Sequence, residues 1–472
     1  PQTSDVKRIT ISKRTMQPVD TPRRIAIIGG GLSGTLTAIQ LLRQCQHALH
    51  IDLIEKNAEV GLGVAYGTAF AEHLLNVPAR NMSLFPDDPA HFHRWLAQVH
   101  PGQYEPESFV PRMIYGKYVQ QTWQAALRNK PEAASVAVHQ ARAEAATPEA
   151  SQVRIRLDAG DDVMAGKVVL ALGNFSPTDP VAVQPEWVDQ KQYVRNPWTQ
   201  QAYDSLASLQ NLLLIGSGLT ALDVIMAACK QGFRGKFHLV SSHGRLPLPY
   251  TDANYGSEPP PVTLLSSTPT VGELITYFKQ ERSRRHGNWQ AVMRMLRPLV
   301  PEVWQQLPLP EKRLFLRRVS SLWNVHRHRV SEQVTRTVGL LRQTGRLFHY
   351  KGRVTLLDCD QGTMKVQVRN GQHRQCLSAD RVVNCTGPCS DVERLAHTDS
   401  LIRSLLESGS VRPDTLRMGF DALPDGQLLD AAGVPSPCLY TLGPPMKGIL
   451  FECTAVPEIR EQARDLAGRL LR

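Results

Sequence analysis

The 472 residues are 42% hydrophobic and 21% charged with a formal net charge of +11, which is typical of a globular protein long enough for two or three domains. No stretch is apolar over the length that a membrane helix needs, so we expect no membrane span. The eight cysteines are scattered without a C-x-x-C pair. This argues against a disulfide framework or a metal site and favours a reduced, cytoplasmic setting.

A polar, basic stretch at residues 1–22 lacks the apolar core of a secretory signal, and we interpret it as an N-terminal tail. An apolar run at residues 24–28 then predicts a buried strand, and the glycines after it are spaced G-x-G-x-x-G before an apolar helix face. In this motif the first glycine permits a tight turn, the second lets backbone N–H groups approach a pyrophosphate, and the third lets the helix pack on the strand. The helix start would meet the phosphates with its partial positive charge. The residues of this turn that we predict to bind a cofactor are Gly29, Gly31, Leu32, Ser33 and Gly34.

The next apolar run, residues 51–54, predicts a second strand that leads into Glu55 and Lys56. Glu55 lies about twenty residues after the glycines, where a carboxylate can accept a hydrogen bond from a ribose 2′-hydroxyl. A glycine motif alone also occurs in flexible loops, but a strand, a helix and an acid in register predict a dinucleotide-binding unit. We therefore include Glu55 and Lys56 among the predicted cofactor-binding residues.

Two irregular segments follow this unit. Residues 61–68 (GLGVAYGT) are rich in glycine and predict a loop against the cofactor, and residues 73–88 predict turns because Asn, Pro, Ser and Asp recur. Tyr66 and Asn76 in these segments are the candidate catalytic residues near the reactive ring, with packing of the two loops as the alternative role. A helix is expected from about Tyr115.

A further buried strand is predicted at residues 168–172, with Gly173 at its exit. We include Gly173 among the cofactor-binding residues. The four prolines of residues 175–198 predict a connector between two parts of the chain.

A second nucleotide signature comes after this connector. Residues 211–215 predict a strand, a glycine turn follows, a helix continues from Leu222, and residues 237–240 predict the next strand. Two such units in one chain are far more specific than one. The predicted cofactor-binding residues of this turn are Gly216, Gly218, Leu219, Thr220 and Ala221.

The second unit differs from the first at the end of its second strand. That strand ends in Ser241 and leads to Arg245, without an acid that would repel a 2′-phosphate. Hydroxyl groups and an arginine at this point favour NADP(H) over NAD(H), with NAD(H) as the alternative. We therefore predict that Ser241 and Arg245 contact the nicotinamide cofactor.

A proline-rich break at residues 255–262 precedes a segment, residues 265–345, that reads as helical and strongly basic. From Lys279 to Arg353 it holds 17 Lys and Arg against 4 Asp and Glu, a net charge of +13. One interpretation is a solvated arginine-rich surface whose apolar stems pack on neighbours. The other is a positive field that draws in an anion, such as NADPH or an acidic substrate. Nucleic acid is the lesser alternative, because no nucleic-acid motif accompanies the charge. In its densest cluster, residues 323–329, we expect arginines to contact an anion rather than histidines to bind a metal.

The last part of the chain returns to strand patterns. Residues 353–357 and 364–368 predict a hairpin, and residues 381–385 predict a buried strand with Gly387 at its exit. We include Gly387 among the cofactor-binding residues.

The C-terminal segment, residues 438–471, predicts a strand with Gly443 at its exit and then a helix that Thr454 caps. One face of this helix is apolar and is expected to pack in the core; it consists of Val456, Ile459, Ala463, Leu466 and Leu470. The helix start can direct N–H groups at a flavin ring or a phosphate. The predicted cofactor-binding residues here are Gly443, Thr454, Ala455 and Val456.

With these motifs the sequence resembles flavoproteins that bind two dinucleotides, and specifically the YdhS-like FAD/NAD(P)-binding family, distantly similar to flavin-containing and N-hydroxylating monooxygenases. The stretches that carry the resemblance are IIGGGLSG, GLGVAYGT, HLLNVPARNMS, IGSGLTALDV, WNVHRHR, VVNCTGP and LGPPMKGILFECTAVPEIREQA. They are spread over nearly all of the chain after residue 22.

The resemblance implies an α/β fold with two Rossmann-like dinucleotide-binding domains and a basic helical segment. Residues 23–205 and 370–472 would form the FAD-binding domain, and residues 206–369, with the helical segment 265–345, an inserted NAD(P)-binding domain. The first glycine turn and Glu55 would hold the adenosine half of FAD, and the C-terminal helix start would lie near its flavin half. The second glycine turn would take NADP or NAD.

Among flavoproteins, the disulfide reductases need a cysteine pair after the first nucleotide motif, and this chain has none there. The first hypothesis is therefore an FAD-dependent NAD(P)H monooxygenase, N-hydroxylating by resemblance, that uses O2 on a small amine or amino-acid-like substrate. The cofactor would carry the chemistry, which fits the absence of a recognisable catalytic triad. The alternatives are an FAD-dependent reductase or dehydrogenase without oxygenation, and a regulatory module that binds the cofactor as a structural ligand.

Overall fold

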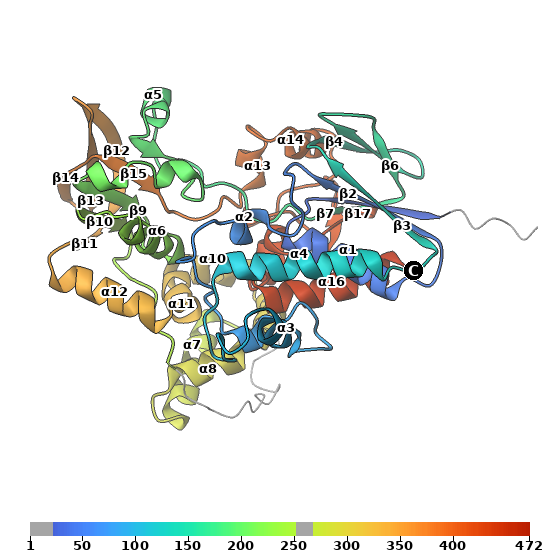
Figure 1. The fold of residues 1–472 in the computed structure, drawn as a ribbon, viewed down its shortest axis with the longest axis horizontal. Coiled ribbons are helices and arrows are strands. Elements are labelled where there is room, and N and C mark those ends of the chain that lie inside the picture. Colours follow the sequence, from blue (N-terminus) through green and yellow to red (C-terminus); the bar gives the residue numbers. More distant parts are fainter. Residues whose placement is uncertain (1–21, 252–267) are drawn as a thin grey trace, which may run out of the picture.

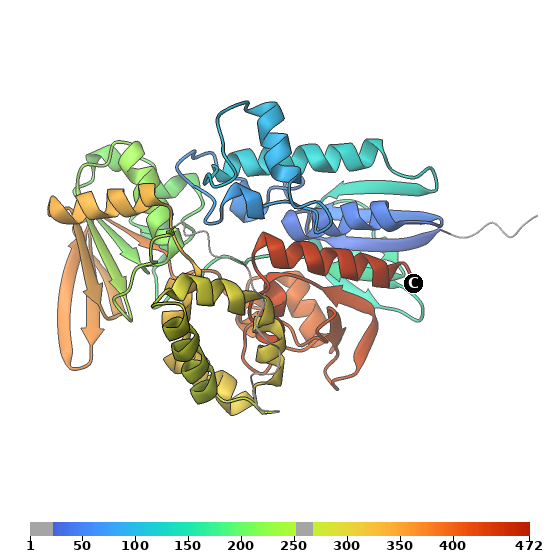
Figure 2. The same ribbon diagram turned by 90° about the horizontal axis from the view of Figure 1, so that it is seen from below.

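The computed structural model describes residues 22–251 and 268–472. Two sheets form the cores of two α/β units that lie side by side (Figures 1 and 2); the first is parallel except for one antiparallel edge strand, and the second is wholly parallel. A group of helices from the middle of the chain lies next to both units (Figures 1 and 2). This arrangement confirms the predicted α/β fold with two Rossmann-like units. The proline-rich break at residues 255–262 and nearly all of the N-terminal tail lie outside the described residues.

The first sheet contains six strands in the order β16-β17-β7-β1-β2-β3. Its central strand, β1, pairs in parallel with β2 and β7, and all four residues at its end are buried. Such strands read as continuous apolar runs because helices or a second sheet cover both faces. The strands are β1 (Arg23–Ile28), β2 (Leu49–Glu55), β3 (Ala134–Gln140), β7 (Lys167–Leu170), β16 (Gln427–Leu429) and β17 (Pro435–Thr441).

The two faces of β1 pack into different cores. Ile25 and Ile27 pack with three helices, α1 (Leu32–Gln44), α4 (Arg112–Arg128) and α16 (Val456–Leu470), which lie together in Figure 1. Ala26 and Ile28 pack instead with a small antiparallel sheet and with α14. The elements of that second layer are β4 (Ala143–Pro148), β5 (Val153–Leu157), β6 (Val163–Ala165) and α14 (Ser400–Glu407). This sandwich fixes the start of α1 above the end of β1.

The second sheet contains five strands in the order β11-β10-β9-β15-β8. They are β8 (Tyr193–Val194), β9 (Asn211–Ile215), β10 (Lys236–Ser241), β11 (Leu347–Lys351) and β15 (Arg381–Asn384). Two helices, α6 (Leu219–Lys230) and α12 (Glu332–Gln343), pack on one face. The other face carries β12 (Arg353–Asp360), β13 (Thr363–Asn370) and β14 (His373–Ala379), and the antiparallel pairing of the first two confirms the predicted hairpin.

The second sheet draws strands from outside the residue range expected for its domain. Both β8 and β15 pair in parallel within this sheet, β15 with β9 and β8 with β15. The expected boundaries at residues 205 and 370 therefore cut through the sheet. A short buried apolar strand looks the same in sequence whichever sheet it joins, so only the pairing partner could reveal this.

The basic segment is helical, as predicted. Its elements before α12 are α7 (Val271–Arg284), α8 (Trp289–Leu296), α9 (Val300–Gln306), α10 (Leu309–Arg318) and α11 (Ser320–Arg327). In Figure 2 these helices lie beside the C-terminal elements of the first unit. Across the two described ranges, none of the helices combines the length and apolar character that crossing a bilayer would require.

Three local predictions were wrong. Residues 63–66, expected in a loop, form a single helical turn, α2 (Gly63–Tyr66), which is too short for periodicity to reveal. The connector at 175–198 contains α5 (Pro185–Asp189) as well as β8. Finally, α4 begins at Arg112 rather than near Tyr115, because Pro111 precedes it as its N-cap with a fixed φ of −54°.

Candidate functional site

The first glycine turn is sterically restricted to glycine at two positions. Gly29 has a φ of +105°, and a Cβ atom there would lie 2.4 Å from the Ala171 carbonyl oxygen. A Cβ at Gly34 would lie 1.8 Å from the Gly29 oxygen, which no backbone adjustment short of moving α1 could relieve. The sequence therefore places α1 directly against the turn that follows β1.

The start of α1 has the features of an anion-binding site. Its N-cap is Gly31, which has no side chain that could accept a hydrogen bond from the first turn of the helix. The N–H groups of such a first turn have no intrahelical acceptors and carry the positive end of the helix dipole. Leu32 and Ser33 of this turn are buried, so the site is enclosed by the fold.

Glu55 ends β2 beside this turn, as its position in the sequence predicted. One carboxylate oxygen accepts a hydrogen bond from the Gly30 N–H at 2.7 Å, and the other accepts from the Asn57 N–H at 2.9 Å. Glu55 is buried, whereas Lys56 is exposed. The acid is thus held in place by backbone donors and faces the glycine turn.

The C-terminal segment returns to the same place. Gly443 has a φ of +74°, and a Cβ there would lie 2.9 Å from Ser33 Oγ. Its N–H donates to Gln462 Oε1 of α16 at 2.8 Å. Residues more than 400 positions apart, Ser33 and Gly443, therefore meet at the start of α1.

The predicted cap of α16 was wrong by one residue. The N-cap is Ala455, and no side chain caps the helix. The partly buried Thr454 precedes it, and Val456 is the first helical residue. Because Pro457 lies in the first turn with its φ fixed, it sets the helix start here without a capping hydroxyl. The predicted apolar stripe is confirmed, since every one of its side chains is buried.

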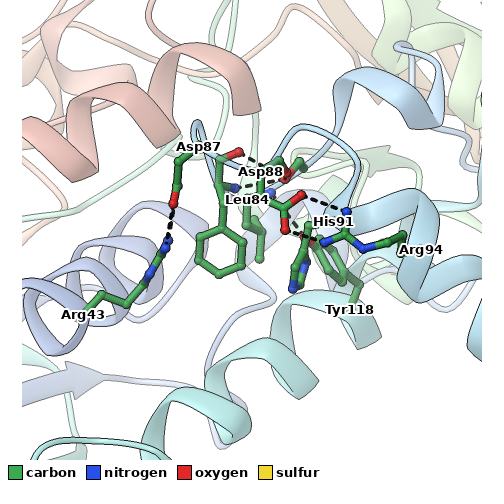
Figure 3. A network of polar contacts seen from close by, with 9 residues as sticks. Arg43, Leu84, Asp87, Asp88, His91, Arg94 and Tyr118 are labelled. Carbon is green, nitrogen blue, oxygen red and sulfur yellow. Dashed lines mark hydrogen bonds and ion pairs between the residues drawn. The ribbon is translucent and has the colours of Figure 1, made fainter.

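The turn-rich segment 73–88 is fixed between helices by a polar network (Figure 3). Asp87 pairs with Arg43 of α1 at 2.8 Å, and Asp88 pairs with Arg94 of α3 (His91–Val99). Leu84 donates its N–H to the Tyr118 hydroxyl of α4 at 3.3 Å. The segment that carries Asn76 is therefore anchored at its far end on three helices of the first unit.

The two candidate catalytic residues lie in this region but differ in their surroundings. Tyr66 packs its ring 4.8 Å from that of Tyr115, and burial raises the pKa of the Tyr66 hydroxyl to about 12. This hydroxyl is therefore a neutral donor near pH 7. Asn76 is partly buried, and within the described ranges no hydrogen bond is made by its side chain, so its amide is available to a ligand.

The second glycine turn is more open than the first. A Cβ at Gly216, whose φ is +121°, would lie 2.3 Å from the Cys385 carbonyl oxygen, so this glycine is required. A Cβ at Gly218 would meet no atom of the described residues within 4 Å, and Gly218 is exposed. At the start of α6, Leu219 and Thr220 are partly exposed, while Ala221 is buried.

The end of β10 carries the polar residues that were predicted to select NADP. The Ser241 hydroxyl is hydrogen-bonded to His349 Nε2 at 2.9 Å. The exposed Arg245 donates from Nη1 to Ser321 Oγ at 2.8 Å, and its carbonyl accepts from the Ser217 hydroxyl beside Gly216. Arg245 thus lies next to the second glycine turn.

Two glycines lie in the segments where the chain passes from one α/β unit to the other. Gly173 and Gly387 both have positive φ, of +63° and +96°, and a Cβ at either would meet no atom within 4 Å. The two crossing segments lie together, because Asn384 Nδ2 donates to the Thr178 carbonyl at 3.1 Å. Glycine is therefore favoured at both positions by the positive φ of the backbone, and not because a neighbouring atom lies too close for a side chain.

A buried polar cluster joins the two units, and the sequence analysis missed it. Arg112, at the start of α4, pairs with Asp223 of α6 at 2.9 Å, and both side chains are largely buried. Burial raises the pKa of Asp223 to about 6, opposed by Arg112. Burial and then Arg112 lower the pKa of His73 to about 4. Asp223 is a charged residue within the apolar sequence of α6, and this was the signal in the sequence that could have indicated a buried ion pair.

In the basic cluster at residues 323–329, Arg327 pairs with a carboxylate of the protein itself, which corrects the expectation of an external anion for this arginine, and Arg329 donates to the Gln290 side-chain oxygen. Arg327 donates from Nε to Glu452 Oε2 at 3.0 Å, and both residues are buried. Arg297 makes a bidentate pair with Glu458, in the first turn of α16, at 2.6 and 2.8 Å. The helical segment is therefore anchored on the start of α16 by paired internal charges.

A family model described as FAD-NAD(P)-binding matches residues 26–175, which cover the first glycine turn and Glu55. No curated protein matches the chain at a significant level.

Several solved structures are similar over the whole chain. The ornithine N-hydroxylase of Kutzneria sp. 744, with reduced FAD, NADP+ and L-ornithine in its description, superposes with a TM-score of 0.64 at 13% identity, covering 95% of this chain and 99% of that one. The L-lysine 6-monooxygenase of Pseudomonas syringae gives a TM-score of 0.64 at 14% identity, with 95% and 99% covered. A thioredoxin reductase of T. acidophilum gives 0.51 at 11% identity, with 95% and 98% covered. At these identities the similarity defines the fold.

Proposed function

We propose that the protein is an FAD- and NADPH-dependent monooxygenase that N-hydroxylates an amine. One observation carries the proposal: the fold combines an enclosed first glycine turn with an open second one, and it is shared with amine N-hydroxylating enzymes at a TM-score of 0.64. The finer membership in the YdhS-like group rests on the sequence motifs quoted above.

The residues at the first turn fit an FAD. The uncapped start of α1 suits the pyrophosphate, because Gly31 leaves the backbone N–H groups uncovered and the helix dipole favours negative charge. Glu55 would accept from the ribose 2′-hydroxyl with the second lone pair of Oε2, since Gly30 donates one hydrogen bond to that oxygen and Asn57 donates its N–H and its side-chain amide to Oε1. Gly443 and the residues 454–456 would lie near the flavin half.

The second turn fits a nicotinamide dinucleotide that binds and leaves. Gly216 and Gly218 bring the backbone to the pyrophosphate, and Arg245 would pair with the 2′-phosphate of NADPH. To do so, its guanidinium would leave the Ser321 hydroxyl, an exposed contact that costs little to break.

When bound, FAD would supply hydride acceptance and O2 activation, and the net reaction would convert an amine, O2, NADPH and a proton into a hydroxylamine, water and NADP+. The protein would supply position and exclude water. Tyr66, neutral at pH 7, would donate a hydrogen bond from its hydroxyl, and the Asn76 amide would orient the amine. The substrate would be a small amine or amino-acid-like molecule.

Two steps of one experiment test the proposal. Under anaerobic conditions, NADPH should bleach the flavin of the purified protein; if it does not, the protein is a cofactor-binding module. Admission of 18O2 with ornithine, lysine or cadaverine as the amine should then give a product with one labelled oxygen. Complete conversion of O2 to H2O2 with every amine in the series would identify a reductase without oxygenation instead.

We also propose a cytoplasmic location, from the unpaired cysteines, of which Cys385 and Cys453 are buried. Measurement of free thiols in the protein purified without reductant tests this: eight titratable thiols per denatured chain are expected.

A further inference from the structure

A cavity of about 870 Å³ lies among the helices of the basic segment, outside both glycine turns. Helices α7 to α11 enclose it, and Phe451, which follows α15 (Lys447–Leu450), closes its inner end. This volume is typical of sites for small organic ligands, which occupy about 300–1,000 Å³. The cavity is therefore large enough for a ligand of its own.

The inner wall of the cavity is aromatic, and its polar atoms are already paired. The Phe451 ring stacks on Trp304 with centroids 4.5 Å apart and meets Phe315 edge-on at 5.3 Å. The Trp304 indole N–H donates to the Gly448 carbonyl, and that of Trp323 donates to Glu452, each at 2.8 Å. Because the acceptors of these donors, Gly448 and Glu452, do not line the cavity, the aromatic part of the wall is apolar, which favours a hydrocarbon or aromatic ligand body.

The mouth of the cavity, in contrast, is positively charged. Lys279 and Arg282 of α7 and Arg318 of α10 line it and are exposed, against a single acid, Glu302. Within residues 22–251 and 268–472 none of these three cations forms an ion pair. The neighbouring Arg284 on the same helix does pair, with Glu281 at 2.6 Å. Arg282 Nε donates to the Gly287 carbonyl at 3.3 Å, a contact that leaves its charge without a counter-ion. The three cations at the mouth can thus pair with an external anion.

We propose that this cavity binds a free amphipathic carboxylate, with a single hydrocarbon chain against Phe451 and its acid group at Lys279, Arg282 and Arg318. The apolar wall and the unpaired cations together select this class over amines and over polar metabolites. The proposal does not rest on the monooxygenase function, because neither the cavity nor its test requires a bound flavin.

Isothermal titration calorimetry of the full chain with monomeric dodecanoate, decanoate and dodecylamine tests the proposal. Dodecanoate should bind saturably, about tenfold more tightly than decanoate, because each buried methylene contributes about a threefold gain. It should also bind at least fivefold more tightly than dodecylamine. Absence of saturable binding, or equal binding of the amine, would overturn the proposal.

Matched variants localise the site. Arg318→Glu should weaken dodecanoate binding about tenfold, whereas Arg317→Glu, the same charge change on the next residue outside the lining, should change it less than twofold. Equal losses in the two variants would indicate general surface attraction and would contradict the assignment.

A second pair of variants tests the apolar part of the proposed binding site. Leu322→Trp narrows the cavity that Leu322 lines, and Leu340→Trp makes the same change on α12 outside it. Both leucines are exposed, at 43% and 61%, so both variants should keep the melting temperature of the parent. Only Leu322→Trp should lose dodecanoate binding, and unchanged binding in that variant would refute the placement of the chain.

Discussion

The two glycine turns share a motif but differ in how far the protein surrounds them. At the first, Leu32, Ser33 and Gly34 are all buried, and α16, Glu55 and α2 close around them. At the second, Gly218 is exposed, and within the part of the chain that the structure describes no atom lies within 4 Å of a Cβ built there. Under the proposed function, this difference in enclosure, rather than the shared motif, would separate a retained cofactor from one that exchanges in each turnover.

Alanine substitutions in the two glycine turns should give the largest difference in cofactor binding and in folding stability. Gly34→Ala places a methyl group 1.8 Å from the Gly29 oxygen, so it should abolish FAD binding and cost more than about 3 kcal/mol of folding stability. Gly218→Ala meets no atom and should cost less than about 1 kcal/mol, with the flavin content unchanged. Flavin absorbance and thermal unfolding check both variants, and similar losses in the two would break the comparison.

The acid of the first turn should have the next largest effect. Glu55→Gln removes a charged acceptor of the Gly30 N–H, and we expect FAD affinity to fall tenfold or more, since charged hydrogen bonds contribute about 1.5–3 kcal/mol. Fluorescence titration with FAD measures the change. Glu59→Gln, an exposed acid four residues on, is the control, and an equal effect there would rule out a specific role of Glu55.

The protein should lose folding stability in acid because of a partly buried histidine at the end of α11. Burial, followed by Arg327 and other cations, lowers the pKa of His328 to about 3. In the unfolded chain His328 takes up a proton near pH 6.5, whereas in the folded protein it stays neutral down to about pH 3. The contribution of neutral His328 to folding stability is therefore fully present above pH 6.5 and is lost as the pH falls toward 3. From this shift we expect a loss of about 1–2 kcal/mol between pH 7 and 5.

Denaturant unfolding of His328→Gln at both pH values checks this expectation. The variant should lose less stability on acidification than the parent, and His397→Gln, an exposed histidine, should behave as the parent does. An unchanged pH dependence in His328→Gln would show that the residue titrates normally in the fold.

The smallest effect concerns the open site. Arg245→Ala should raise KM for NADPH about three- to tenfold and leave KM for NADH unchanged, because an exposed charge pair with a phosphate contributes about 1 kcal/mol. Steady-state flavin reduction with each nucleotide measures both constants. A parallel rise in both would place Arg245 away from the 2′-phosphate.

Much of the fold could be predicted because its signals are local. The runs that became β1, β9 and β10 were located to within two residues, since buried parallel strands are continuously apolar and glycines mark their ends. The partners of β8 and β15 could not be predicted, because pairing depends on residues far apart in sequence.

The same limit applies to the candidate site: residues at a fixed spacing could be predicted from the sequence, and contacts between distant residues could not. Glu55 and the glycines follow a fixed spacing, so the sequence locates them. The Arg112–Asp223 and Arg327–Glu452 pairs join residues more than 100 positions apart and leave no local pattern. The prediction that Thr454 caps α16 was wrong because Pro457, with its fixed φ, sets the start of the helix. The proline and the threonine are competing signals within the same few residues.

The retention of the two cofactors tests the central claim most directly. The protein is saturated with FAD and NADP+, passed through a desalting column, and the eluted nucleotides are quantified after denaturation. Enclosure of the first turn predicts close to one FAD per chain and almost no NADP+. Loss of FAD together with NADP+, or retention of NADP+ alone, would contradict the account.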